Sequence, residues 1–148
     1  MTVNCVDSSA LLRLVFVEGD TRLVAQAMNA SPTVAALALV EVPCAIEARV
    51  LRGEYPPHER LAARREADRL LAAVTVVPLT AIVRQATIEI AEQHLLRTLD
   101  AIHLGTALSV ARRQRRYGNE VRFCTADRRQ AEVVEALLGA ERVDFVPP

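Results

Sequence analysis

Lysine and tryptophan are absent from this chain of 148 residues, and glycine and aromatic residues are scarce. All eighteen basic residues are therefore arginines, and they balance eighteen acidic residues to a formal net charge of zero. Without net positive charge, composition gives no support for a nucleic-acid partner, and only a local basic patch could do so. The three Phe and two Tyr residues are too few for an aromatic platform that stacks single-stranded bases.

The absence of lysine and of glycine-rich segments excludes several classes of α/β protein. A response-regulator receiver domain needs a lysine near its last strands. A haloacid-dehalogenase-type phosphatase needs a second aspartate two residues after the first, whereas Ser8 and Ser9 follow Asp7. The five glycines never form the phosphate-binding loop of a P-loop or dinucleotide-binding protein.

Cysteine patterns and long hydrophobic runs are also missing. The cysteines are Cys5, Cys44 and Cys124. Their odd number and spacing indicate neither a disulfide framework nor a zinc site, so we expect reduced and mostly buried thiols. The apolar run 11–17 is too short to cross a membrane, and no basic region of a secretory signal precedes it. We therefore expect a cytoplasmic protein without a membrane partner, folded as a single domain over residues 1–148.

Strand-like and helical patterns alternate along the chain. The predicted strands are 3–6, 33–39, 74–79, 121–124 and 143–146. The predicted helices are 9–18, 23–28, 42–51, 58–73, 81–93, 99–115 and 128–138, with Pro43 in the first turn of the third. Strands separated by helices imply crossovers between parallel strands. We therefore predict an α/β fold with a central, mostly parallel sheet of about five strands and helices on both faces.

Acidic residues lie near the ends of these predicted strands. Asp7 ends the first strand, Glu41 lies just beyond the second and Asp127 just beyond the fourth, while Asp100 begins the helix that leads into the fourth. Ligands of open α/β sheets bind at the carboxyl ends of strands, so we expect the four carboxylates to converge. Their mutual repulsion is relieved by a hard divalent cation such as Mg²⁺ or Mn²⁺. Such an ion can activate water and orient a phosphodiester, so the pattern predicts metal-assisted phosphodiester hydrolysis.

Helix capping is the alternative explanation for the same residues. Asp7, Ser9, Thr125 and Asp127 precede predicted helices, where short polar side chains commonly serve as N-caps. Asp127 and Gln130 even have the spacing of a capping box. Capping is the simpler interpretation of any one acid, but the joint arrangement and the sequence around each acid favour a common site.

Four segments around the acids resemble the signature segments of PIN domains. They are VDSSALL at Asp7, LALVEVPCAI at Glu41, RTLDAIHLGTAL at Asp100 and FCTADRRQ at Asp127. Their order and spacing fit over the whole chain, and the similarity is greatest to VapC-type toxins of toxin–antitoxin pairs. The resemblance implies a Rossmann-like, three-layer α/β/α fold and an endoribonuclease that uses Mg²⁺ or Mn²⁺ to cleave RNA. It also implies a cognate antitoxin, and we further expect a homodimer.

The resemblance assigns roles to individual residues. The catalytic and metal-binding acids would be Asp7, Glu41, Asp100 and Asp127, with Ser9 and Thr125 as polar helpers that orient carboxylates or water. Whether each acid would hold the metal directly or through water is open. The alternative function is an inert PIN scaffold that binds RNA or protein. Such a scaffold should have lost one or more acids, whereas all four are present.

The remaining candidates are a histidine, a set of arginines and the apolar helices. His103 lies on the same helical face as Asp100, and we expect it to be packed or supporting rather than catalytic. The candidates for contact with the RNA backbone are Arg112, Arg113, Arg115, Arg116 and Arg128. These arginines could equally be solvated charges near helix ends. Apolar surface on the helices predicted at 9–18, 42–51 and 58–73 could be core, a dimer face or an antitoxin groove.

Overall fold

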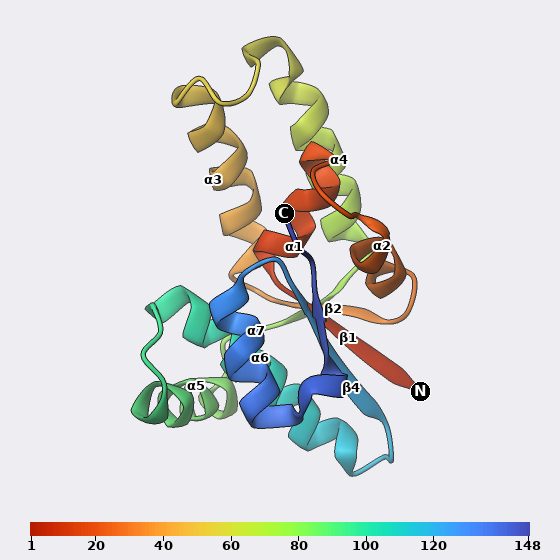
Figure 1. Cartoon of the computed structure of the whole chain (residues 1–148), viewed down its shortest axis with the longest axis vertical. Coiled ribbons are helices and arrows are strands. Elements are labelled where there is room, and N and C mark those ends of the chain that lie inside the picture. Colours follow the sequence, from red (N-terminus) through yellow and green to blue (C-terminus); the bar gives the residue numbers. More distant parts are fainter.

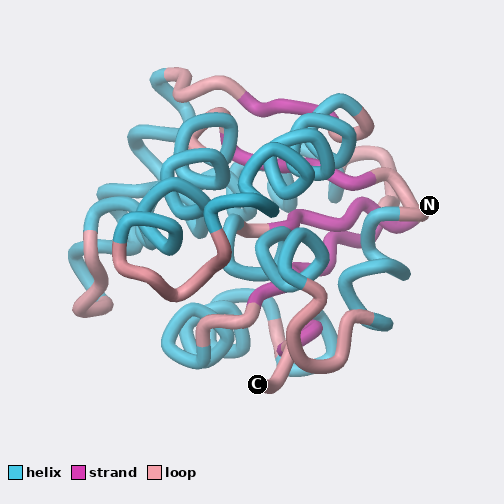
Figure 2. The backbone as a smooth tube through the Cα atoms, turned by 90° about the horizontal axis from the view of Figure 1, so that it is seen from above, coloured by secondary structure: helices cyan, strands magenta, loops and turns pink.

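A computed structural model describes residues 1–148 as a parallel five-stranded sheet with helices on both faces (Figure 1, Figure 2). The strands are β1 (Thr2–Val6), β2 (Pro32–Ala35), β3 (Thr75–Val77), β4 (Glu120–Thr125) and β5 (Val143–Phe145). The α-helices are α1 (Ser8–Phe16), α2 (Arg22–Met28), α3 (Ala38–Leu51), α4 (Arg60–Ala72), α5 (Ala81–Gln93), α6 (Thr98–Arg115) and α7 (Arg128–Leu138). Two short 3₁₀ helices cover Pro57–Glu59 and Ala140–Arg142. The predicted α/β/α fold class is confirmed.

Successive strands are added first on one side of β1 and then on the other, so the strand order reverses at the centre of the sheet. The order is β3-β2-β1-β4-β5, and every neighbouring pair is parallel. The chain therefore moves outward from β1 on one side through β2 and β3, and on the other side through β4 and β5. Open α/β sheets bind ligands where strand order reverses, beyond the carboxyl ends of the two central strands. In this protein that place lies between the ends of β1 and β4.

Successive side chains of the central strands point to opposite faces of the sheet and contribute to two separate hydrophobic cores. Val3 and Cys5 of β1 belong to the core beneath α5, α6 and α7, whereas Val6 belongs to the core beneath α1 to α4. On β4, Phe123 joins the first of these cores and Cys124 the second. Successive residues of a strand point to opposite faces, so a sheet buried on both sides needs apolar residues at both sets of positions. Figure 2 shows the strands running between the two helical layers.

Gly105 lets α6 approach α5 closely. A Cβ atom at this position would lie 2.1 Å from Oγ1 of Thr87 and 2.7 Å from its Cα, which is too close for any side chain. Thr87 belongs to α5, so the backbone of α6 at Gly105 packs directly against Thr87 of α5. This contact fixes the helix that carries Asp100 and His103 relative to its neighbour.

The structure corrects the predicted second strand. β2 ends at Ala35 and α3 begins at Ala38, whereas the sequence predicted a strand to residue 39. Glu41 therefore lies in the first turn of a helix rather than just beyond a strand. Pro43 lies inside α3 rather than in its first turn. The apolar run from Ala35 to Val40 has neither helical nor strand period, which explains the misplaced boundary.

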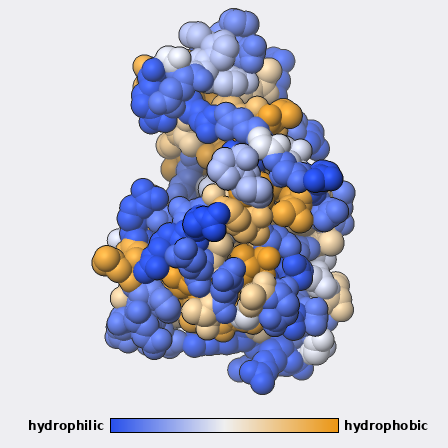
Figure 3. Space-filling model, viewed as in Figure 1, coloured by the Kyte–Doolittle hydropathy of each residue, from blue (hydrophilic) through white to orange (hydrophobic).

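The α3–α4 pair extends away from the sheet as an arm (Figure 1). In the same view, Figure 3 shows a hydrophilic tip on this arm and hydrophobic residues nearer its base. Several large apolar side chains of the pair are exposed, including Val40 at 61%, Leu51 at 87% and Leu61 at 62%. None of the helices combines the length and the hydropathy that a membrane crossing requires.

Candidate functional site

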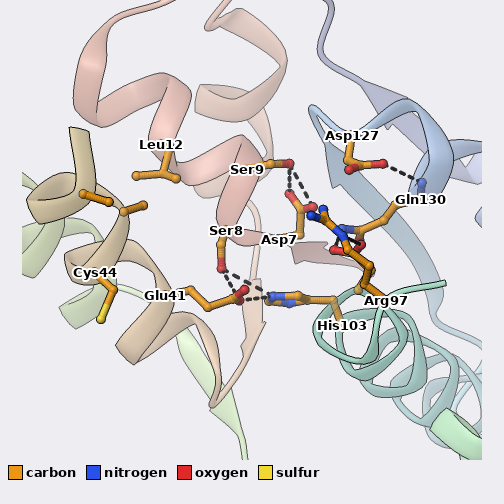
Figure 4. Close-up of a pocket in the computed structure, with 13 residues that line it drawn as sticks. Asp7, Ser8, Ser9, Leu12, Glu41, Cys44, Arg97, His103, Asp127 and Gln130 are labelled. Carbon is orange, nitrogen blue, oxygen red and sulfur yellow. Dashed lines mark hydrogen bonds and ion pairs between the residues drawn. The ribbon is translucent and has the colours of Figure 1, made fainter. Parts of the chain in front are cut away.

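A cavity of about 420 Å³ opens at the carboxyl edge of the sheet, and all four predicted acids line it. Each acid arrives from a different part of the chain. Asp7 follows β1, Glu41 lies in the first turn of α3, Asp100 in the first turn of α6, and Asp127 directly precedes α7. Figure 4 shows these segments converging around the cavity.

Asp7 is the most deeply buried acid of the cavity. Its relative exposure is 1%, and it has no arginine partner. Oδ1 accepts the backbone N–H of Ala10 at 2.9 Å, so Asp7 is the N-cap of α1. The hydroxyls of Ser9 and Thr125 each donate to the carboxylate at 2.8 Å. Burial raises the pKa of Asp7, although nearby His103 and the hydrogen bonds act in the opposite direction.

Ser9 and Thr125 tie the loop after β4 to the first acid. Besides holding Asp7, the Ser9 hydroxyl accepts the N–H of Ala126 at 3.0 Å, and the Thr125 hydroxyl accepts the N–H of Asp127 at 2.9 Å. Asp127 in turn caps α7 by accepting the N–H of Gln130 at 2.9 Å. The two residues expected to support the site therefore connect Asp7 with the segment that carries Asp127.

The half-buried Glu41 is held by the buried side chains of His103 and Ser8. His103 donates from Nε2 to Oε1 of Glu41, and the Ser8 hydroxyl donates to the same oxygen at 2.8 Å. Burial acts to lower the pKa of His103, but the bond to Glu41 and the charges of Asp7 and Asp100 raise it overall. Burial acts to raise the pKa of Glu41, but the same bond and the imidazolium charge lower it overall. The raised pKa of His103 favours its charged form beside the acids that line the cavity.

Asp100 is held by two side chains of different character. The guanidinium Nε of Arg97 donates to Oδ2 at 3.0 Å, and the amide Nε2 of Gln130 donates to Oδ1 at 3.1 Å. The Arg97 side chain is 82% exposed, whereas Gln130 is only 3% exposed. The N-terminal turn of α6 is thereby joined to the N-terminal turn of α7 across the cavity.

The donor atoms of the cavity suit a hard divalent cation. Oxygen ligands dominate, and neither Oε2 of Glu41 nor Oδ2 of Asp127 takes part in the hydrogen bonds of its carboxylate. No three His, Cys, Asp or Glu residues lie close enough together to ligate one ion jointly. Mg²⁺ commonly keeps several waters and binds one or two carboxylates directly, so a closed protein cage is not required. The residues therefore fit such an ion bound partly through water.

The arginines proposed for RNA contact lie away from this cavity. Arg112, Arg113, Arg115 and Arg116, the α6 arginine cluster, stand at the C-terminal end of α6. Asp100 lies in the first turn of the helix, so about 18 Å of helix separates it from the nearest of them. Arg112 is paired with Glu89 at 2.7 Å. Arg128 lies closer to the acids, but its guanidinium stacks on the ring of Phe145 at 4.6 Å.

Sequence reasoning overlooked three residues that line the cavity: Ser8, Arg97 and Gln130. Arg97 precedes Asp100 by three residues, the spacing of neighbours on a helix, and this signal could have identified it. The sequence indicates Gln130 only as part of a capping box. Its contact with Asp100 spans 30 residues and depends on how α6 and α7 pack.

Comparison with known proteins assigns the chain to a family. The family model of the PIN domain matches residues 5–136, so the chain belongs to the PIN domain family. Two solved structures share its fold. PAE2754 from Pyrobaculum aerophilum has a TM-score of 0.63 at 19% identity, over 97% of this chain and 83% of that one. VapBC2 from Rickettsia felis, bound to a DNA fragment from its promoter, has a TM-score of 0.64 at 9% identity, over 99% of both chains. No curated protein matches the sequence.

Proposed function

We propose that this protein is an endoribonuclease that depends on Mg²⁺ or Mn²⁺. The observation that carries the proposal is the meeting of four carboxylates, from four separate segments, in one cavity at the switch point of the sheet. Membership of the PIN domain family supports a nuclease. The choice of RNA over DNA rests on the resemblance of the four segments to VapC-type toxins.

The residues of the cavity divide into those that would hold the ion and those that orient them. Asp7, Asp100 and Asp127 would hold it with Glu41, directly or through water. Once bound, a divalent ion supplies a water of lowered pKa and stabilises the charge that develops on the phosphodiester. Glu41 is fixed through Oε1 by Ser8 and His103, which leaves Oε2 to accept a proton from the attacking water.

Arg97 is the exposed cation at the mouth of the cavity. Only its Nε is used by Asp100, so its two terminal amino groups are available to a phosphate of the RNA backbone. Guanidinium groups bind phosphate oxygens through paired hydrogen bonds, so Arg97 is suited to bind a backbone phosphate at the mouth of the cavity. Within the proposal, Arg97 therefore holds substrate, while His103 balances charge inside the cavity.

Cleavage assays with metal and chelator test the proposal directly. The purified protein should cut RNA in Mg²⁺ or Mn²⁺ and stop in EDTA. Asp100→Asn should lower the cleavage rate at least about 100-fold, because even outer partners of metal ligands contribute about 10–100-fold. Asp68→Asn is the matched control, since Asp68 is exposed on α4 and makes no ion pair, and it should cleave normally. Undiminished cleavage in EDTA, or by Asp100→Asn, would contradict the proposal.

An inert PIN scaffold is the competing function, and the same assay separates the two. An inert module should bind RNA or a protein without cleaving RNA under any metal condition. It should also show no affinity for Mn²⁺, because Asp7 and Asp127 would only cap helices, and Glu41 and Asp100 would only pair with neighbouring side chains. The pairing of a raised pKa at Asp7 with three other acids in one cavity favours the enzyme, since capping alone needs no such convergence.

We extend the proposal to the toxin of a toxin–antitoxin pair, with a cognate antitoxin and a homodimer as its protein assemblies. The structure from Rickettsia felis pairs its chain with a second protein and promoter DNA, which supports an antitoxin as partner. For the homodimer, Leu79 is 52% exposed and lines a small apolar hollow of about 100 Å³, and Ile82, three residues further along the chain, is 72% exposed. Growth arrest on expression, relieved by Asp100→Asn, tests the toxin role. A sedimentation measurement on wild type and Ile82→Glu tests the dimer.

A further inference from the structure

Gln130 occupies a position that its role as a helix residue does not explain. It lies in the first turn of α7, is 3% exposed and lines the acidic cavity. Figure 4 shows its side chain reaching from α7 toward Asp7 and Arg97. The amide Nε2 donates to Oδ1 of Asp100 at 3.1 Å. A side chain of one helix thus fixes an acid that belongs to another.

The capping box that the sequence predicts is only half formed. Asp127 caps the N–H of Gln130, as expected. In a complete capping box the Gln130 side chain would return to the N–H of Asp127. That N–H instead donates to the Thr125 hydroxyl at 2.9 Å. Because the Thr125 hydroxyl already accepts the N–H of Asp127, the Gln130 side chain is not needed as a cap, and its amide lies toward the cavity.

The amide oxygen of Gln130 is buried and has no hydrogen-bond partner. Unpartnered buried side-chain oxygens are rare in folded proteins, because burial removes their hydration. Rotating the amide by half a turn would not resolve this, since it would set Oε1 against the Asp100 carboxylate, and both atoms are acceptors. The orientation is thus fixed by Asp100, and Oε1 remains a buried acceptor without a donor, on a side chain that lines the cavity.

We propose that Gln130 is a positioning residue of the divalent-ion site. Through Nε2 it orients Asp100, and through Oε1 it accepts a hydrogen bond from a water in the hydration shell of the ion. The inference rests on the proposed function, because it requires an ion in this cavity. Mg²⁺ and Mn²⁺ sites retain waters whose protons need acceptors, and outer acceptors of this kind tune metal affinity. The neutral amide is suited to both contacts, since it offers a donor and an acceptor on one rigid group.

Mn²⁺ titrations followed by electron paramagnetic resonance test the role without measuring cleavage. Gln130→Met keeps the length of the side chain and removes both polar atoms, so it should weaken Mn²⁺ binding about 10–100-fold. Gln130→Glu keeps an acceptor but exchanges the donor to Asp100 for a carboxylate oxygen. Because its added negative charge attracts the cation more than the lost bond weakens the site, it should bind Mn²⁺ at least as tightly as wild type. Val133→Ala is the matched control, because Val133 is buried on the same helix in the core beneath it. It should lower the thermal midpoint and leave the Mn²⁺ affinity unchanged.

The possible outcomes separate this inference from the proposed function. If wild type binds Mn²⁺ and Gln130→Met binds it equally well, the role of Gln130 is wrong and the ion site stands. If Gln130→Glu binds Mn²⁺ as weakly as Gln130→Met, the amide oxygen does not face the ion's hydration shell, and the inference is again overturned. If Gln130→Met does not fold, Mn²⁺ binding by Gln130→Glu that is clearly weaker than that of wild type overturns it by itself. If wild type itself binds no Mn²⁺, the ion site is wrong and the role of Gln130 falls with it.

Discussion

Asp7 of the cavity and two acids of surface loops, Asp20 and Glu54, are neutralised in different ways. On the surface, Asp20 and Glu54 each form an ion pair with an arginine two residues away in sequence. The Arg22 guanidinium lowers the pKa of Asp20 to about 2. In the cavity, Asp7 has no arginine partner, and burial raises its pKa. An aspartate side chain is thus favoured as an anion at Asp20 and disfavoured at Asp7.

The difference shows where the fold tolerates an energetic cost. An exposed pair contributes little to the free energy of unfolding, because water and salt screen it. A buried carboxylate held by hydroxyls and one backbone N–H opposes folding at neutral pH unless a cation joins it. Such local costs are typical of functional sites, which supports the proposal that the function belongs to the cavity and not to the surface pairs.

The largest expected effect on stability comes from removing a hydroxyl that supports Asp7. Thr125→Val deletes the donor to the buried Asp7 and leaves the N–H of Asp127 without its acceptor. It should lower the free energy of unfolding at pH 7 by about 1–3 kcal/mol. Thr33→Val is the control, because Thr33 is also buried but its hydroxyl makes only a 3.5 Å bond to Ser31. Urea denaturation of both variants measures the difference.

The pH dependence of that loss has a definite sign. The folded-state pKa of Asp7 is raised, so its favourable contribution is complete below the unfolded pKa and disappears as pH rises through the folded pKa. Thr125→Val removes a donor to the anion and should raise that pKa further. Part of the destabilisation should therefore be present at pH 7 and absent near pH 3. An equal loss at both pH values would mean that Thr125 acts through packing alone.

A smaller effect is expected from the α6 arginine cluster. If these side chains touch RNA phosphates, converting all four to Gln should flatten the salt dependence of RNA binding. The log–log slope should change by about 0.7 for each phosphate that is no longer neutralised. Fluorescence anisotropy in the Asp100→Asn background avoids cleavage during the measurement. Converting Arg65 and Arg69 on α4 to Gln provides a control outside the cluster. A slope equal to that of the control would identify the cluster as solvated charge.

The smallest effect is expected at the surface pairs. Asp20→Asn breaks the ion pair with Arg22 but should not change the thermal midpoint measurably at pH 7. Because the pKa of Asp20 is lowered, its contribution is present above the unfolded pKa and is lost only as pH falls through about 2. Thermal scans at low and high salt check this expectation. A clear loss at neutral pH would weaken the distinction between surface and cavity acids.

Much of the fold could be predicted from local patterns. The predicted bounds of α5 and α7 agree with the structure, because Thr80, Asp127 and Gly139 mark their ends with unambiguous caps. The strand β3 is shorter than predicted, with only three residues in the sheet. The predicted start of α3 was wrong because residues 35–40 are all apolar, and such a run shows neither the helical nor the strand periodicity.

The site was predicted only in part, for a physical reason. Acids at strand ends follow from topology, so their approach to one edge could be expected from the order of strands and helices. The partners that fix each acid depend on the packing of side chains far apart in sequence. His103, for example, contacts Glu41, which lies 62 residues earlier in the chain. Short-range spacing has no information on such contacts. The pairing of His103 with Glu41 could therefore not be read from the sequence.

The most direct test of a common ion site is the thermal stability of wild type and Asp7→Asn, each in EDTA and in Mn²⁺. Asn keeps the N-cap bond to Ala10 and removes the buried charge, so the variant should unfold at a higher temperature in EDTA, by about 2–4 °C per kcal/mol. Mn²⁺ at 100 times its Kd should stabilise wild type by about 2.7 kcal/mol and the variant much less. If Asp7 only caps α1, Asn is an equivalent cap. The two proteins would then melt alike in EDTA and respond alike to Mn²⁺, and the four acids would not form one site.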